Sequence, residues 1–293
     1  MPCGRSDYHY STSTGYANYH ALQAELRRRF ANGLQALVSY TWSKCLGVSS
    51  GWCNVENGTN GGAVTENYFN QSLSYGPCAF DIPQDVTLSA DYGLPFGRGK
   101  KYLTHGPLAW AFGNWETNLF FIGRSGQNFQ ITNGSGDPAA ISGTGGIGKT
   151  SVSGYDRPDV VPGQPLIPSN QSQLQWFNPA ALCIIPSSPG QTVPKGALAP
   201  MCTDVLPGSF SVFGDLGLSV LRDQFFYNVD FSLSRRFRIS ELKSLQIRAE
   251  AFNVFNMQIL GIPGADVTSG TLGVIHSIAS TPRELQLGAK FVF

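Results

Sequence analysis

The feature that most constrains this fold is an alternation of apolar and polar residues, repeated in runs of about ten residues. It is clearest at the C-terminus, where Leu285, Leu287, Ala289, Phe291 and Phe293 alternate with polar residues and glycine. A period of two is typical of a β-strand with one apolar and one polar face. Six earlier runs repeat it, with apolar series that begin at His20, Leu34, Val86, Trp115, Tyr227 and Leu245. The sequence therefore predicts seven two-faced strands.

The first of these runs fits two structures. Tyr19, Leu22, Leu26 and Phe30 have the spacing of an apolar stripe on a helix, while His20, Leu22, Ala24 and Leu26 have that of a strand. We expect a strand here because every later predicted element is one.

Composition narrows the class of protein. The chain holds 34 Gly and 18 Pro among 293 residues, and only 13% of its residues are charged, which argues against a solvated helical bundle. A net charge of +1 gives no field for a polyanion, so no nucleic-acid partner is expected. No apolar run approaches the roughly 18 residues of a membrane-spanning helix. A transmembrane β-barrel stays compatible, because its strands alternate apolar and polar residues.

The connections between the predicted strands alternate in length. The shorter ones are 31–33, 96–114 and 238–243, and the long ones are 44–84, 133–225 and 257–282. In an up-and-down sheet this places every long connection at one end, as in outer-membrane barrels with short periplasmic turns and long extracellular loops. The predicted fold is therefore all-β: an antiparallel up-and-down transmembrane β-barrel, here a partial barrel of about seven strands.

This pattern divides the chain into eight expected segments. They are a loop stub at 1–15, a hairpin at 16–43, a long loop at 44–84, a hairpin at 85–132, a very long loop at 133–225, a hairpin at 226–256, a loop at 257–281 and a terminal strand at 282–293. On the polar faces we expect a set of side chains that line the lumen: Glu25, Gln35, Glu116, Arg248, Glu250, Gln286 and Lys290. Basic residues gather at the expected periplasmic ends, and we expect most of them to be solvated: Arg27, Arg28, Arg29, Arg98, Lys100, Lys101, Arg235, Arg236 and Arg238.

Several ordered strings carry a resemblance to a known family. They are NYHALQAELRRRFANGLQALVSYTWSKC, GPCAFDIPQDVTLSADYGLPFGRGK, RPDVVPGQP, WFNPAAL, FGDLGLSVLRDQFFYNVDFSLSRRFRI, LQIRAEAFNVFN and PRELQLGAKFVF. In this order the chain resembles the end of TonB-dependent receptors of the Oar-like type. The resemblance implies an outer-membrane barrel of roughly 22 strands with an N-terminal plug, moved by a TonB-type energy-coupling protein. It also implies that Phe293 is the C-terminal aromatic signal read by the barrel-assembly machinery.

The chain departs from that family in its extent. Seven strands do not close a barrel of the usual even count, and no plug, energy-coupling box or signal peptide precedes Tyr8. We therefore expect the last third of a receptor in the outer membrane of a Gram-negative bacterium, with lipid around it, and no transport by this segment alone.

The six cysteines all fall in predicted loops or in the N-terminal stub, and none in a predicted strand. They are Cys3, Cys45, Cys53, Cys78, Cys183 and Cys202. Oxidising surroundings and loops with little core of their own favour disulfides, and we expect one between Cys183 and Cys202. Which others pair among Cys45, Cys53, Cys78 and Cys3 stays open, and free buried thiols are the alternative.

Motifs for chemistry are weak. Segment 143–150 has the spacing of a phosphate loop and segment 47–51 that of a nucleophile elbow, but no predicted helix follows either one. The four histidines show no paired ligand spacing, so we expect no metal site. Without a recognisable cluster of base, metal ligands and nucleophile, we also expect no cofactor and no enzyme activity.

The expected function is energised passage of a large solute, such as an oligosaccharide, a peptide or a metal chelate. Aromatic faces stack on sugars and aromatic ligands. The candidate ligand contacts are loop aromatics: Trp52, Tyr68, Phe69, Tyr155, Trp176 and Phe177. The alternative is a soluble or secreted β-rich adhesive or carbohydrate-binding module.

Overall fold

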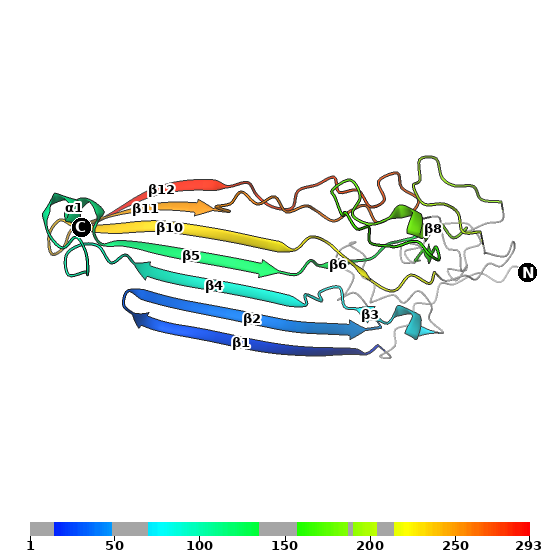
Figure 1. Ribbon diagram of the computed structural model, residues 1–293, viewed down its shortest axis with the longest axis horizontal. Helices are drawn as coiled ribbons and strands as arrows, with labels where there is room; N and C mark the ends of the chain where they lie inside the picture. Colours follow the sequence, from blue (N-terminus) through cyan, green and yellow to red (C-terminus); the bar gives the residue numbers. More distant parts are fainter. Residues whose placement is uncertain (1–14, 49–69, 135–156, 187–189, 204–213) are drawn as a thin grey trace, which may run out of the picture.

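A computed structural model describes residues 15–48, 70–134, 157–186, 190–203 and 214–293. Its centre is one antiparallel sheet in which seven long strands lie side by side in chain order (Figure 1). These strands are β1 (Ala17–Ala31), β2 (Leu34–Gly47), β4 (Gln84–Gly93), β5 (Trp115–Arg124), β10 (Phe226–Arg238), β11 (Ser244–Phe252) and β12 (Glu284–Val292). A two-residue strand, β3 (Gly76–Pro77), pairs with the end of β2. The seven predicted strands are confirmed, and the first run is a strand rather than a helix.

The register places every predicted apolar series on one face of the sheet. Leu26 pairs with Val38, Val38 with Leu88, Leu88 with Phe121, and Phe121 with Val229, so one apolar row crosses five strands. Directly paired residues in a sheet share a face, because side chains alternate along each strand. The predicted lumen residues therefore all lie on the opposite face: Glu25, Gln35, Glu116, Arg248, Glu250, Gln286 and Lys290.

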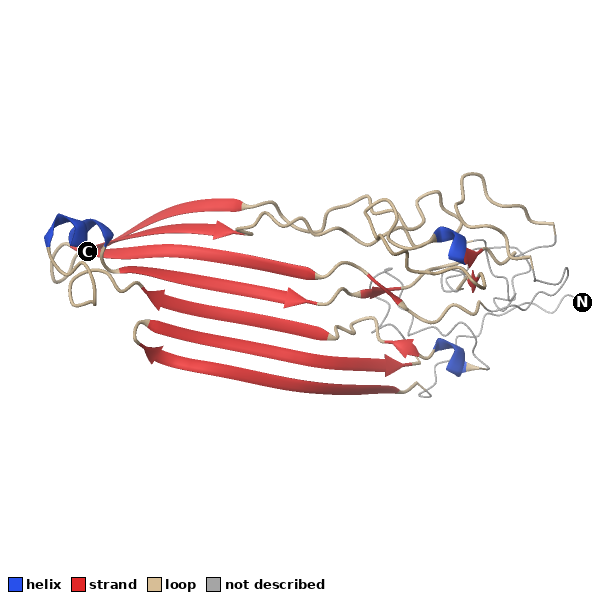
Figure 2. Cartoon of the chain, in the orientation of Figure 1, coloured by secondary structure: helices blue, strands red, loops and turns tan. Residues whose placement is uncertain are grey.

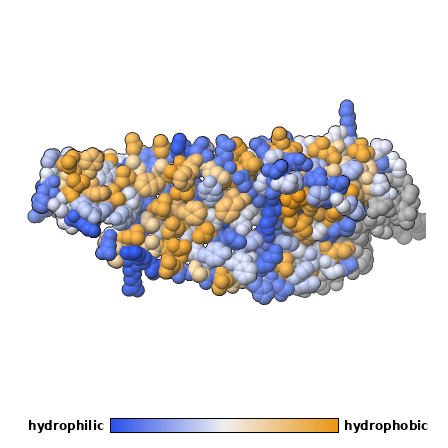
Figure 3. Space-filling model, in the orientation of Figure 1, coloured by the Kyte–Doolittle hydropathy of each residue, from blue (hydrophilic) through white to orange (hydrophobic). Residues whose placement is uncertain are grey.

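The apolar face is open to its surroundings. Leu26 on β1 and Leu285 and Leu287 on β12 are among its exposed large side chains, and Figure 3 shows hydrophobic residues spread over the strands. A soluble sandwich would cover such a face with a second large sheet. The other sheets of the described residues, β6 with β9 and β7 with β8, have two strands each. The arrangement is that of an open, partial barrel wall.

The two ends of the sheet differ, as the connection lengths predict. At one end, called here the turn end, the connections are the Asn32–Gly33 turn, the 94–114 segment and the 239–243 turn, and the C-terminus lies there too (Figure 1). Asn32 and Gly33 have φ of 54° and 81°, as in the two-residue hairpins that favour Asn-Gly. All the long connections leave the other end, called here the loop end (Figure 2).

Helices are few and short among the described residues. They are α1 (Gly106–Phe112) at the turn end and two 3₁₀ turns at the loop end, η2 (Gln71–Ser74) and η3 (Pro179–Ala181). None of the helices in the described segments has the length and apolar content needed to cross a membrane. The sequence pattern predicted 96–114 to be a connection without a helix, so α1 was not expected.

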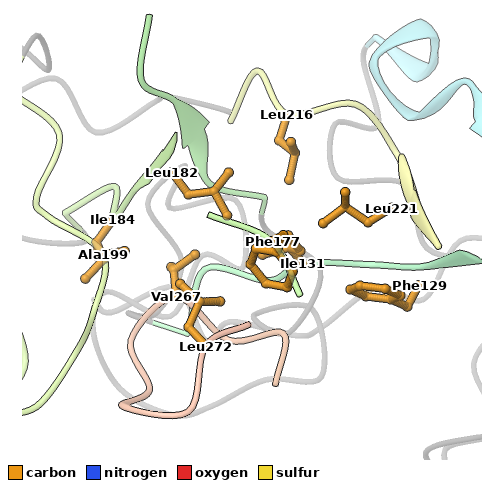
Figure 4. Packing of buried hydrophobic residues seen from close by; sticks show 10 residues of the cluster. All are labelled: Phe129, Ile131, Phe177, Leu182, Ile184, Ala199, Leu216, Leu221, Val267 and Leu272. Carbon is orange, nitrogen blue, oxygen red and sulfur yellow. The ribbon is translucent and has the colours of Figure 1, made fainter. Parts of the chain in front are cut away.

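The loop end has a hydrophobic core, contrary to the expectation that such loops have little core of their own. Two connections build it, 125–225 and 253–283, which include the short strands β6 (Asn128–Phe129), β7 (Asp159–Val160), β8 (Leu182–Cys183) and β9 (Leu221–Arg222). We call this unit the loop cap. Its buried core is shown in Figure 4 and comprises Phe129, Ile131, Phe177, Leu182, Ile184, Ala199, Leu216, Leu221, Val267 and Leu272.

One prediction about the cysteines is corrected here. Cys45 lies in β2 and Cys183 in β8, so the expectation that no cysteine is in a strand is wrong for both. The reason at Cys45 is that β2 keeps its pairing with β1 beyond residue 43, with Cys45 opposite Tyr19. The hairpin predicted at 16–43 therefore extends to Gly47.

Candidate functional site

A buried acid joins the loop cap to the sheet. The Asp81 side chain has no exposed surface, and its carboxylate accepts a hydrogen bond of 2.6 Å from the backbone N–H of Cys45. It forms ion pairs with Arg222 and, at 3.6 Å, with Lys44. Arg222 also donates to the carbonyl oxygens of Asp81 at 2.8 Å and Gly126 at 3.0 Å. One carboxylate thus holds together β2, the connection before β4 and strand β9.

A disulfide reinforces the same place. Cys45 bonds to Cys78, with a Cα–Cα distance of 5.4 Å, and the backbone N–H of Cys78 donates to the Cys45 carbonyl oxygen. The sequence left this pairing open. The predicted bond between Cys183 and Cys202 is present too, with a Cα–Cα distance of 4.9 Å.

One cluster among the described residues has the spacing of a metal site. It comprises Asp159, Cys183 and Cys202. Both sulfurs are already joined in the disulfide, so neither is a thiolate that could hold a metal ion. This cluster therefore gives no support to a metal centre.

Asp223 follows Arg222 and lies where β9 leads into β10. Burial raises the pKa of the Asp223 carboxyl above its usual value, against a lowering by the backbone N–H of Gln127 and the guanidinium groups of Arg124 and Arg222. Gly126 lies against this residue: a Cβ there would be 2.1 Å from the Asp223 carbonyl oxygen. The chain is therefore closely packed where the cap meets the sheet.

The structure corrects one of the predicted ligand contacts and leaves the others as predictions. Phe177 has 0% exposed surface and packs against Phe129 with ring centroids 6.2 Å apart, so its role is in the core of the cap. Trp176 is half-buried, and its indole N–H donates to the Arg222 carbonyl oxygen at 2.8 Å. The other four, Trp52, Tyr68, Phe69 and Tyr155, lie outside the described residues. The 143–150 segment and Ser49 and Gly51 of the 47–51 pattern also lie outside them.

A cavity opens on the polar face of the sheet at the loop end. Its volume is about 490 Å³, and its lining residues are Tyr19, Thr41, Ser43, Phe80, Ile82 and Asp85. Tyr19 and Phe80 expose their rings, and the Asp85 carboxylate makes no hydrogen bond or ion pair within the described part of the chain. Exposed rings and an uncommitted carboxylate can stack on and hydrogen-bond to a solute. Sequence patterns missed this cavity, although the placement of Tyr19 and Asp85 on the polar face follows from the strand alternation.

On the polar face away from the cavity, polar side chains form hydrogen bonds with one another. The Asn118 amide donates to the Asp91 carboxylate, and the Ser232 hydroxyl donates to the Asn118 oxygen at 2.9 Å, which links β4, β5 and β10. Asp230 accepts from the Asn228 side chain at 2.9 Å. Such a face suits contact with water or a polar partner rather than with lipid.

The C-terminal residue is accessible at the turn end. Phe293 is 89% exposed, and its ring stacks with that of Phe291 at 6.0 Å between centroids. Another protein could therefore contact this aromatic end, and its recognition by the barrel-assembly machinery stays a prediction.

Comparison with known protein families places the chain among membrane barrels. The family described as the outer membrane beta barrel domain matches residues 2–286, nearly the whole chain. No curated protein matches the sequence.

Proposed function

The chain belongs to the outer membrane β-barrel domain family, and we propose that it is part of the barrel wall of a TonB-dependent receptor. In this proposal it is the C-terminal part of a receptor that carries a large solute across the outer membrane of a Gram-negative bacterium. The apolar face contacts lipid, the polar face lines the lumen, and the loop cap faces the outside. No chemistry on the solute is part of the proposal.

The observation that carries it is the two-faced sheet with one capped end. Strands of 9 to 15 residues are long enough to cross a bilayer, and each puts its apolar series on the same face. Long connections at one end and short ones at the other are typical of outer-membrane barrels.

Two further observations support the TonB-dependent subtype and the class of solute. The ordered strings, from NYHALQAELRRRF to PRELQLGAKFVF, resemble this class of receptor. The loop-end cavity suits a solute with apolar ring faces and hydroxyl donors, because Tyr19 and Phe80 offer ring faces and Asp85 offers an acceptor. An oligosaccharide has both features, and we favour it over a peptide or a metal chelate.

Growth of the producing bacterium on single oligosaccharides tests this function. We expect at least one oligosaccharide on which growth fails when either this gene or the gene of the energy-coupling protein is deleted, because passage needs inner-membrane energy. The double variant Tyr19→Ala/Phe80→Ala should take up that oligosaccharide several-fold more slowly at an unchanged level in the outer membrane. Tyr102→Ala, which removes an exposed aromatic at the turn end, is the matched control and should take it up normally.

Two results would contradict the proposal. Uptake that persists without the coupling protein, or after a protonophore collapses the proton gradient, would exclude energised transport. Normal uptake by the double variant would remove the loop-end cavity from the solute path.

A further inference from the structure

The helix α1 exposes three large apolar side chains. Leu108 is 58% exposed, Trp110 70% and Phe112 60%, while Ala109 alone is buried. No residue of Gly106–Phe112 carries a charge. A helix of seven residues is not stable in water on its own, and apolar side chains exposed to water do not stabilise it. Large exposed apolar patches mark binding surfaces.

Contacts fix α1 beside the apolar face of the sheet. The Trp110 ring lies 6.0 Å from that of Phe237, and Phe237 pairs with Leu245 on the apolar face of β10 and β11. The indole N–H of Trp115 donates to the Ala111 carbonyl oxygen at 3.3 Å. The helix therefore lies on the lipid side of the wall, at its turn end, and not over the lumen.

Arg235 anchors the end of the helix. Its side chain projects from the apolar row of β10, where it pairs with Trp115, and only 6% of the residue is exposed. The guanidinium donates to the carbonyl oxygens of Trp110 and of Ala111, at 2.6 Å for the latter, and lies 4.2 Å from the Phe237 ring centroid. Carbonyl oxygens at a helix C-terminus and aromatic faces both favour a cation. Arg235 is therefore not one of the solvated basic residues that the sequence led us to expect.

The surroundings of α1 match a membrane–water interface. Its apolar side chains continue the apolar face of the sheet, and Figure 3 shows hydrophobic residues gathered at the turn end as well as over the strands. A basic turn lies next to it: a Cβ on Gly97 would be 2.8 Å from the Gly113 Cα, and Arg98 and Lys101 follow closely after Gly97. At membrane–water interfaces Trp rings lie at headgroup depth, and cations close to the surface are attracted to lipid phosphates.

We propose that α1 is an interfacial anchor that binds phospholipid in the periplasmic leaflet of the outer membrane. Leu108, Trp110 and Phe112 enter the boundary between headgroups and acyl chains, while the basic turn contacts lipid phosphates. The anchor fixes the depth of the turn end in the bilayer. This inference rests on the proposed outer-membrane location.

Quenching of tryptophan emission by brominated lipid tests the anchor. The receptor that contains this chain is reconstituted into phosphatidylcholine vesicles whose acyl chains carry bromine either near the glycerol backbone or near the chain end. The emission of Trp110 is the difference between the unchanged protein and Trp110→Phe. We expect it to lose most of its intensity with the shallow bromine and much less with the deep one.

Two further single variants make the outcomes distinct. Trp42→Phe reports a residue exposed on the apolar face of β2, and Trp176→Phe reports one held in the loop cap. Quenching of Trp42 but not of Trp110, with Trp110 accessible to iodide in water, would overturn the anchor and leave the barrel location intact. Absence of quenching at both Trp42 and Trp110 would overturn the proposed location and the anchor together. Trp176 should be unaffected by bromine at either depth.

Discussion

Replacing Arg222 with Met is expected to lower the free energy of unfolding of the loop end by roughly 3–5 kcal/mol. The substitution removes the closest cation from the Asp81 carboxylate, whose side chain has no contact with solvent. It also removes donors to the carbonyl oxygens of Asp81 and Gly126. The measurement is denaturant unfolding of the detergent-refolded protein, followed by tryptophan emission.

Lys44→Met is the matched control, because Lys44 pairs with the same carboxylate at 3.6 Å but is about half exposed. It should cost less than about 1 kcal/mol, as partly solvated ion pairs do. Adding Asp81→Asn to Arg222→Met should recover part of the loss, since the buried charge disappears. Equal and small losses for Arg222→Met and Lys44→Met would show that Asp81 is not the link between cap and sheet.

The second large effect is expected at Phe177. Phe177→Ala should destabilise the loop cap by about 3–5 kcal/mol, because it leaves a cavity in a core where the ring is fully buried. The neighbouring Trp176, whose indole N–H bonds to the cap backbone, reports the unfolding through its emission.

Phe80→Ala serves as the control for ring loss at an exposed site and should change stability by less than about 0.5 kcal/mol. A Phe177→Ala protein as stable as the unchanged one, but with weakened solute binding, would contradict the core assignment. It would restore Phe177 as a ligand contact.

The sheet could be predicted because its signal is local. A strand such as 284–292 shows its two faces in its own residues, and each neighbouring strand repeats the period. The polar-face positions, for example Glu25 and Lys290, followed from the same alternation and needed no knowledge of the pairing.

The cap and its link to the sheet could not be predicted in this way. Val267 and Phe177 meet in one core although many residues separate them, and their segments show no period. Asp81 and Arg222 lie 141 positions apart, so nothing local distinguishes either from a solvated charge. The apolar run of α1 is too short to show a helical stripe, and its role depends on Arg235 of another strand.

A scan of spin-label accessibility tests the central claim, that this sheet is a membrane wall with one face to lipid and one to the lumen. Single cysteines at Ser89, Ala90, Asn118 and Leu119 would be labelled in a background whose cysteines outside the two disulfides are Ser. Labels at Ala90 and Leu119 should collide mainly with oxygen, which concentrates in lipid, and labels at Ser89 and Asn118 mainly with a water-soluble nickel complex. Loss of this alternation, or its reversal, would contradict the account.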